Sequence, residues 1–187
     1  MKILQIPGNL GALVKWAGQF SNIEFINESK ISSLAKNEIL CLPGGNKGSL
    51  PSKSLQIEIS NFIKGGGRLF AVCGAFQALF SSNEEDDAGH YLSLFPSRGY
   101  RLKCPNIGFN KIEANWCAIN AYFNCKYGVH YKKEDWAQLD VDYMNLATDK
   151  LGNLQAIQTP SVLGVQFHPE LSFGNFDAVF ENWVLER

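Results

Sequence analysis

The sequence of 187 residues predicts an α/β protein with a doubly wound, mostly parallel sheet flanked by helices. Two observations support this fold class. Short apolar runs that end at Gly or Pro alternate with helix-like stretches in the first half of the chain, an order typical of a parallel sheet covered on both faces. After residue 83 short β-rich pieces follow, which predict a β-rich excursion. We expect residues 1–187 to form a single domain.

The first half of the chain supplies the predicted parallel strands and their helices. The strands are expected at residues 2–6, 23–26, 38–42 and 68–72. Apolar residues at helical spacing predict one helix that begins after a turn at residues 7–9, and a second that begins at Ser52 and ends at three glycines, 65–67. A third helix, over residues 74–81, begins directly after Cys73.

The second half is expected to hold hairpin-like β pieces, followed by one more buried strand and a closing helix. The clearest pieces are residues 121–123 and 154–157, the strand is 163–167 and the amphipathic helix is 176–185. The acidic run at 84–87 is interpreted as a solvated loop.

Composition excludes several classes of function. The 17 basic and 18 acidic side chains give a formal charge of −1, which disfavours binding to nucleic acid, and 45% apolar residues exclude disorder. No apolar run is long enough to span a membrane, and the first residues do not resemble a signal peptide. Five cysteines without a C-x-x-C pair indicate reduced thiols, so we expect a cytoplasmic protein with no metal site.

The most informative segment surrounds Cys73, which is predicted to lie in a sharp turn between an apolar strand and a helix. This is the layout of a nucleophile elbow, which needs small residues two positions before and after the nucleophile. Ala71 and Ala75 occupy those positions. The following helix N-terminus favours a thiolate, and the N–H of Gly74 is placed to donate to an oxyanion. The other interpretation is an ordinary buried cysteine.

Two further segments are expected at the same edge of the sheet. His168 and Glu170, separated by one proline, follow the predicted strand 163–167, so the carboxylate could orient the imidazole as a base for Cys73. Gly44 and Gly45 follow the strand 38–42, where Gly45 becomes a second candidate oxyanion donor. Ligand sites of open α/β sheets gather at such strand ends.

Together these segments resemble the class I, or triad, glutamine amidotransferases. The order is the same: a Pro-Gly-Gly loop, an elbow cysteine with Gln77 four residues on, and a late run of sequence G-V-Q-F-H-P-E at 164–170. Residues 8–10, 77–85, 104–110 and 121–123 narrow the resemblance to the HisH family, the glutaminase subunit of imidazole glycerol phosphate synthase. The resemblance covers essentially the whole chain.

The resemblance implies hydrolysis of L-glutamine to glutamate and ammonia. Cys73, His168 and Glu170 would form the catalytic triad, while Gly44, Gly45, Gly74 and Gln77 would bind the oxyanion or the substrate. The ammonia would pass to histidine synthesis in a HisF-like (β/α)₈-barrel synthase subunit, which forms a heterodimer with the glutaminase. No metal or organic cofactor is implied.

The sequence departs from the family pattern at three places. Ala71 and Ala75 replace the usual glycines, and residues 124–127 read Asn-Cys-Lys-Tyr where the family has V-H-S-Y, which helps hold the glutamine. Residues 44–48 read Gly-Gly-Asn-Lys-Gly where the family usually has G-V-G. Three alternatives therefore stay open: a paralogue that delivers ammonia to another acceptor such as a bacterial surface sugar, a non-catalytic binding subunit, and an elbow-cysteine peptidase, against which His168 and Glu170 argue.

Overall fold

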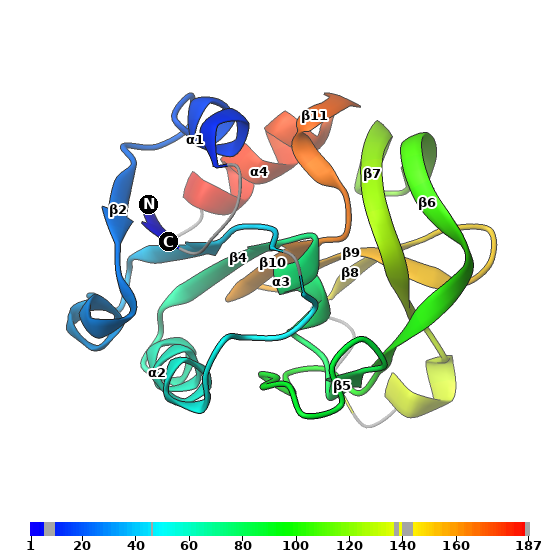
Figure 1. The fold of residues 1–187 in the computed structure, drawn as a ribbon. Coiled ribbons are helices and arrows are strands. Elements are labelled where there is room, and N and C mark those ends of the chain that lie inside the picture. Colours follow the sequence, from blue (N-terminus) through cyan, green and yellow to red (C-terminus); the bar gives the residue numbers. More distant parts are fainter. Residues whose placement is uncertain (6–9, 46, 137–138, 140–143, 186–187) are drawn as a thin grey trace.

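The structure, a computed structural model, describes residues 1–5, 10–45, 47–136, 139 and 144–185. Within these residues eleven strands form one sheet (Figure 1). The strands are β1 (Lys2–Leu4), β2 (Glu24–Ile26), β3 (Ile39–Leu42), β4 (Arg68–Val72), β5 (Ser82–Asn83), β6 (Arg98–Ala114), β7 (Cys117–His130), β8 (Asn145–Thr148), β9 (Asn153–Gln158), β10 (Val162–Val165) and β11 (His168–Gly174). The main path is β2-β1-β3-β4-β10-β9-β7-β6-β5.

The first five strands of this path are parallel, which confirms the predicted fold class. β1 lies between β2 and β3, and β4 lies between β3 and β10, with every pair parallel. These short runs are almost wholly buried from β3 onward, as expected for strands covered on both faces. The predicted strands match β1 to β4 within two residues, although residues 6–9, with the predicted turn, lie outside the described residues.

Helices cover both faces of the parallel strands. The α-helices are α1 (Gly11–Ala17), α2 (Lys53–Lys64), α3 (Gly74–Gln77) and α4 (Phe176–Leu185), and the 3₁₀ helices are η1 (Glu28–Ser33) and η2 (Lys133–Trp136). α1 and α4 lie on one face and α2 on the other (Figure 1). The core divides accordingly: Trp16 and Phe180 pack on the first face, and Ile59 and Phe76 on the second.

The sequence dictates α2 and α4 most directly. The Ser52 hydroxyl accepts a 3.0 Å hydrogen bond from the Leu55 N–H, which caps α2, and the helix ends before Gly65. Leu55, Ile59 and Phe62 then form its buried face. α4 has the predicted bounds and buries Phe176, Phe180 and Trp183.

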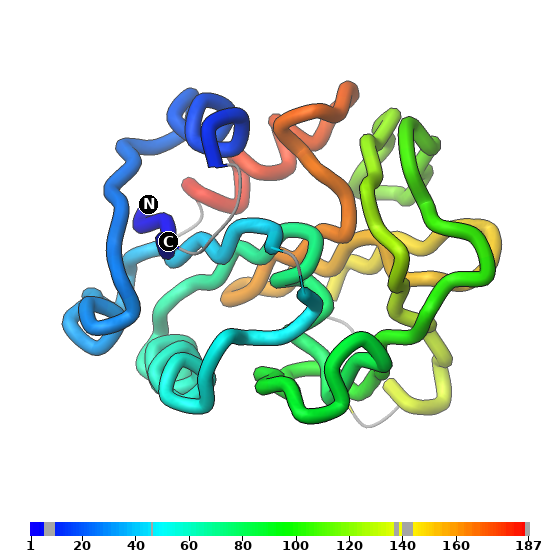
Figure 2. The backbone as a smooth tube through the Cα atoms, in the orientation of Figure 1, coloured from blue at the N-terminus to red at the C-terminus, as the bar shows by residue number. Residues whose placement is uncertain are grey.

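The β-rich excursion contains a long antiparallel hairpin of β6 and β7, which lies toward one end of the sheet (Figure 2), and the shorter antiparallel pair of β8 and β9. The hairpin joins the rest of the sheet through β9 and β11, which pair with different ends of β7. The hairpin interpretation is confirmed, and residues 121–123 and 154–157 lie in β7 and β9.

Two predicted elements have different bounds. The helix expected over residues 74–81 is the single turn α3, because the chain turns at Ala78 to bring Leu79 and Phe80 into the core. The strand expected over residues 163–167 is β10, which ends at Val165. His168 begins a separate strand, β11, which diverges from β10 and pairs antiparallel with β7.

Candidate functional site

Cys73 lies in a strained turn between β4 and α3. Its φ of +53° and ψ of −110° are unusual for a residue with a side chain, and such conformations cluster at functional sites. The Cys73 N–H still donates to the Val165 carbonyl at 2.8 Å, so the sheet holds the residue at the end of β10. Ala71 and Ala75, both buried, fit the space on either side.

The glycine segment after β3 packs directly against this turn. A Cβ on Gly44 would lie 3.1 Å from the Cys73 Cβ and 3.6 Å from the His168 Cε1, so Gly44 contacts both residues. A Cβ on Gly74 would lie 2.6 Å from the Lys47 carbonyl oxygen. Gly44, Gly45 and Lys47 therefore lie close against the elbow, and a side chain at position 44 or 74 would obstruct this approach.

Two backbone N–H groups at this point are available to a ligand. Gly74 is the first residue of α3, so its N–H has no acceptor within the helix. Gly45 precedes Lys47 on the facing segment, and among the described residues its N–H has no hydrogen-bond acceptor. The structure thus brings together the two predicted oxyanion donors at the thiol-bearing turn.

His168 and Glu170 are neighbours on β11 with their side chains joined. The imidazole Nδ1 lies 2.9 Å from the Glu170 Oε1, and Pro169 stands between the two residues. The carboxylate is almost buried, with 8% of its side chain exposed against 22% for His168. Among the described residues the other carboxylate oxygen, Oε2, has no hydrogen-bond partner, so His168 is the group that Glu170 orients.

The electrostatics of His168 favour its protonated form. Burial alone would lower the pKa of the imidazole, but the interactions with Cys73 and Glu170 outweigh burial and raise the pKa to about 10. The structure therefore brings Cys73, His168 and Glu170 into one interacting group, in the order thiol, imidazole, carboxylate.

A polar pocket of about 240 Å³ opens directly over Cys73. Its wall consists of the glycine segment, the elbow, one acidic residue and part of β7: Gly45, Lys47, Gly48, Cys73, Gly74, Gln77, Glu85, Asn124, Cys125, Lys126 and Tyr127. Of the seven site residues predicted from sequence, four line this pocket: Gly45, Cys73, Gly74 and Gln77. Gly44 and His168 contact Cys73 from the side.

Gln77 lines the pocket, but its carboxamide is used within the protein. The Nε2 donates to the Tyr127 carbonyl at 3.2 Å and to the Gln166 Oε1 at 3.0 Å, and the Oε1 accepts from the Asn83 Nδ2 at 2.6 Å. Gln77, Asn83 and Gln166 are all buried. The network therefore fixes the pocket floor and ties the elbow helix to β7.

Glu85 is a site residue that sequence reasoning missed. The sequence predicts that the acidic run 84–87 is a solvated loop, and Glu84 and Asp87 are exposed as expected. Glu85 instead turns inward, lines the pocket and accepts a 2.8 Å hydrogen bond from the Gly48 N–H. Charge patterning within the loop carries no signal for this, because the loop's position depends on contacts with residues 47–49.

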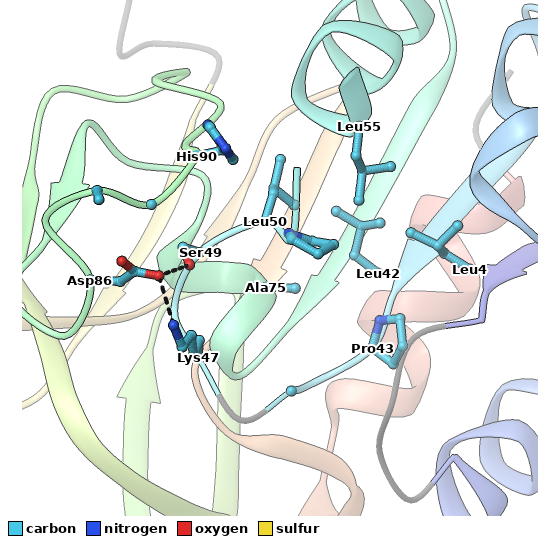
Figure 3. A pocket seen from close by; sticks show the side chains of 14 residues that line it. Leu4, Leu42, Pro43, Lys47, Ser49, Leu50, Leu55, Ala75, Asp86 and His90 are labelled. Atoms are coloured by element: carbon cyan, nitrogen blue, oxygen red, sulfur yellow. Dashed lines mark hydrogen bonds and ion pairs between the residues drawn. The ribbon is translucent and has the colours of Figure 1, made fainter. Parts of the chain in front are cut away.

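A second pocket, of about 410 Å³, lies where β1 and β3 end, at Leu4 and Leu42, beside Pro43 (Figure 3). Leu4, Leu42, Leu50 and Leu55 make most of its wall apolar, while Lys47 and Ser49 reach toward Asp86 at one edge. It shares Gly45 and Lys47 with the pocket over Cys73 but contains neither the thiol nor His168. The two pockets therefore adjoin at Gly45 and Lys47.

The remaining cysteines differ from Cys73 in their surroundings. Cys41 lies in a fully buried strand, where burial, and secondarily the charge of Glu170, raise the pKa of its thiol. Burial raises the pKa of Cys117 to about 11, and burial together with the charge of Cys73 raises that of Cys125 to about 12. Cys104 is exposed, and all five thiols are free.

The described part of the chain offers neither a metal centre nor a membrane span. Its His, Cys, Asp and Glu side chains form no group of three or more that could hold a metal ion. None of its helices is long and apolar enough to cross a membrane.

Comparison with curated proteins finds similarity to HisH subunits of imidazole glycerol phosphate synthase. The HisH subunit of imidazole glycerol phosphate synthase from Thermococcus kodakarensis is 28% identical, over 78% of this chain and 82% of that protein. The subunit of the same name from Halalkalibacterium halodurans is 26% identical, over 96% of this chain and 95% of that protein. No protein-family model matches the chain.

Comparison with solved structures identifies the same fold. A crystal structure described as a glutamine amidotransferase superimposes with a TM-score of 0.72, at 13% identity, over 98% of this chain and 96% of that one. A glutamine amidotransferase from Thermotoga maritima superimposes with a TM-score of 0.58, at 13% identity, over 91% of this chain. At such identities the likeness shows the fold, an α/β sheet with flanking helices.

Proposed function

We propose that this chain, which is HisH-like in sequence and a glutamine amidotransferase in fold, is a glutaminase subunit that hydrolyses L-glutamine to glutamate and ammonia. The observation that carries the proposal is the convergence of three groups. Cys73 lies at a strained elbow, His168 interacts with it while bonded to Glu170 at 2.9 Å, and Gly44 contacts both Cys73 and His168.

The first half-reaction uses the thiolate of Cys73. It attacks the side-chain carboxamide carbon of glutamine, and the carbonyl electron pair moves onto oxygen. The N–H groups of Gly45 and Gly74 stabilise that oxyanion. His168, protonated near neutral pH because Cys73 and Glu170 raise its pKa, gives its proton to the departing nitrogen, so that ammonia leaves and a γ-glutamyl thioester remains.

The second half-reaction reverses the proton flow. His168, now neutral, removes a proton from water, and the resulting hydroxide attacks the thioester carbonyl. Collapse of the second tetrahedral intermediate releases glutamate and restores the thiolate and imidazolium. Glu170 acts throughout as a positioning residue that holds the Nδ1–H side of the imidazole, which leaves Nε2 for proton transfer.

The pocket has the polarity that an amino acid requires. Its wall carries a carboxylate, Glu85, which is suited to the α-ammonium group of glutamine. Gln77, Asn83 and Gln166 keep the floor rigid without offering a charge. A pocket of this size and charge accommodates a small zwitterion better than a peptide chain.

We further propose that the ammonia passes to a HisF-like (β/α)₈-barrel synthase subunit. An aromatic cluster of Phe109, Tyr122 and Phe173 supports a docking partner. Phe109 stacks on Phe173 at 5.7 Å and meets Tyr122 at 5.3 Å, and Tyr122 lies 6.4 Å from the His168 ring. Phe109 and Phe173 are 50% and 65% exposed, which is unusual for rings beside a candidate active site. A partner over this cluster would keep ammonia from water.

Histidine synthesis is the acceptor pathway that the similarity to HisH subunits supports. The free thiols accord with a cytoplasmic heterodimer, in which residues 1–187 act as one domain.

Treatment with a diazo-ketone analogue of glutamine tests the proposed function. We expect one adduct on Cys73, found by mass spectrometry, that added glutamine prevents. Cys73→Ala should lose this adduct, while any reaction at the exposed Cys104 should be insensitive to glutamine. Absence of labelling at Cys73, with the synthase subunit present, would overturn the proposal.

A further inference from the structure

The pocket over Cys73 carries three charged side chains, and they differ in how their charges are satisfied. Lys47 is already engaged: its Nζ lies 3.2 Å from the Asp86 Oδ2, and the ion pair lowers the pKa of Asp86. Glu85 is held in the wall by the Gly48 N–H. Lys126 has no hydrogen-bond or ion-pair partner among the described residues. The pocket therefore offers one carboxylate and one cation that do not pair with each other.

The place of Lys126 on β7 accounts for this availability. β7 pairs with β11 up to Tyr122 and with β9 from Val129, so between these points its edge faces the pocket and has no strand beside it among the described residues. On the other edge, the register with β6 shifts between Arg101 and Asn106, directly opposite Lys126. The irregular ladder and the open edge leave residues 124–127 as the wall of the pocket.

We infer that Lys126 binds the α-carboxylate of the substrate and so restricts the enzyme to α-amino acids with a free carboxyl group. This inference rests on the proposed glutaminase function and deepens it. Glutamine brings an α-ammonium and an α-carboxylate on one carbon atom, and Glu85 and Lys126 are the opposite charges in the same wall. With the carboxamide at Cys73, the two ends of the substrate meet complementary groups.

The residue type matters because, of the four neighbouring residues 124–127 that line the pocket, only Lys126 has a cationic side chain. Its ammonium group offers up to three charge-assisted donors to a carboxylate. The buried thiol of Cys125 beside Lys126 carries no charge, since burial raises its pKa to about 12. Lys126 is thus the source of positive charge in this part of β7.

The test compares glutamine with L-glutaminamide, in which a neutral carboxamide replaces the α-carboxylate. The readout is the concentration of each compound that halves alkylation of Cys73, measured by mass spectrometry, together with KM and kcat for glutaminase turnover. Lys126→Met removes the charge and Lys126→Arg keeps it. Lys132→Met serves as a matched control, because Lys132 lines a different pocket.

We expect Lys126→Met to raise the KM and the half-protecting concentration of glutamine about 10- to 100-fold, with a much smaller change in kcat. Lys126→Arg should recover most of the affinity, and Lys132→Met should match the wild type. The wild type should prefer glutamine to glutaminamide, and Lys126→Met should lose that preference. Retention of the preference in Lys126→Met would overturn the inference.

The same measurements distinguish failure of the glutaminase proposal from failure of the Lys126 assignment. If the wild type binds glutamine in the protection assay without turnover, and Lys126→Met weakens that binding, the site assignment stands while the glutaminase proposal fails. If glutamine does not protect Cys73 in the wild type at all, both are overturned.

Discussion

At the scale of single residues, the site depends on backbone strain at one position. Cys73 adopts a φ of +53°, which costs about 1–3 kcal/mol for a residue with a side chain. The Cys73 N–H bond to Val165, the approach of Gly44 and the small side chains of Ala71 and Ala75 hold it there. This backbone conformation places Cys73 in the lining of the pocket.

Cys73→Gly separates this strain from the chemistry. Glycine adopts a positive φ at little cost, so we expect the variant to lose glutaminase activity while its free energy of unfolding stays equal to or rises above that of Cys73→Ala. Urea denaturation of the two variants measures the difference. A Cys73→Gly protein that is less stable than Cys73→Ala would show that the turn is not strained.

Glu170→Gln tests the orientation and charge of His168. The pKa of His168 is raised above its unfolded value, so its contribution to stability is fully present below about pH 6.5 and is lost as the pH rises toward about 10. The variant weakens one cause of the raised pKa, so we expect a smaller fall in the free energy of unfolding between pH 6.5 and 10. Activity should fall about 10²- to 10⁴-fold.

Urea denaturation across this pH range, with Glu113→Gln as a control for an exposed carboxylate, measures the effect. An unchanged pH dependence in Glu170→Gln would contradict the coupling between Glu170 and His168.

At the scale of elements, the elbow helix is positioned by its packing on β10. Gly164 on β10 lies beneath α3, where a Cβ would come 2.7 Å from the Leu79 Cδ1 and 2.9 Å from the Phe76 Cδ2. Phe76 and Leu79 are fully buried. The position of the nucleophile therefore depends on a close contact between strand and helix.

Gly164→Ala should lower the free energy of unfolding by about 1–3 kcal/mol, because the added methyl overpacks this contact. Leu79→Ala alone should also be destabilising, since it leaves a cavity. The double variant should lose less than the sum of the two, because the smaller side chain accommodates the methyl. Strict additivity in urea denaturation would show that the two positions are independent.

Some helices and strands have local sequence signals and could be predicted, whereas others depend on distant pairing. Periodicity and breakers locate β4, α2 and α4 because their signals are local: apolar runs, the Ser52 cap and the glycines after α2. The start of β11 at His168 could not be predicted in this way. Its partner is β7, some 50 positions earlier in the chain, and pairing at that distance leaves no local pattern.

The site residues likewise fall into those that local motifs predict and those that depend on distant contacts. Cys73, His168 and Glu170 were named from motifs, and the structure brings them together. Glu85 was missed, because its inward turn depends on the Gly48 N–H of a distant segment. Gln77 was expected to bind substrate, yet its carboxamide is bonded to Tyr127, Gln166 and Asn83, so any role in binding is proposed through the shape of the pocket.

At the scale of the whole molecule, the hairpin of β6 and β7 presents the aromatic cluster beside the pocket. Phe109 on β6 and Phe173 on β11 stack on each other although they lie on strands that do not pair directly. Ile107, 62% exposed, lies two residues before Phe109. This apolar surface is what the proposed synthase subunit would cover.

Phe109→Ser and Phe173→Ser should weaken binding to the HisF-like subunit about tenfold or more each, with little effect on the stability of the isolated chain, because both rings are half exposed. Phe25→Ser, which removes a ring of similar exposure on β2, is the matched control. Calorimetric titration measures the affinity. If all three variants bind the subunit as tightly as the wild type does, the partner does not dock on the aromatic cluster.

Direct observation of a γ-glutamyl thioester tests whether Cys73 is the nucleophile that releases ammonia from glutamine. Glutamine is mixed with the protein and the proposed synthase subunit, the reaction is stopped with acid, and the peptides are analysed by mass spectrometry. We expect the glutamyl group on Cys73, none in Cys73→Ser or Cys73→Ala, and loss of the group on transfer to neutral buffer. Release of ammonia without any adduct on Cys73, or a glutamyl group on Cys104 or Cys125 instead, would contradict the account.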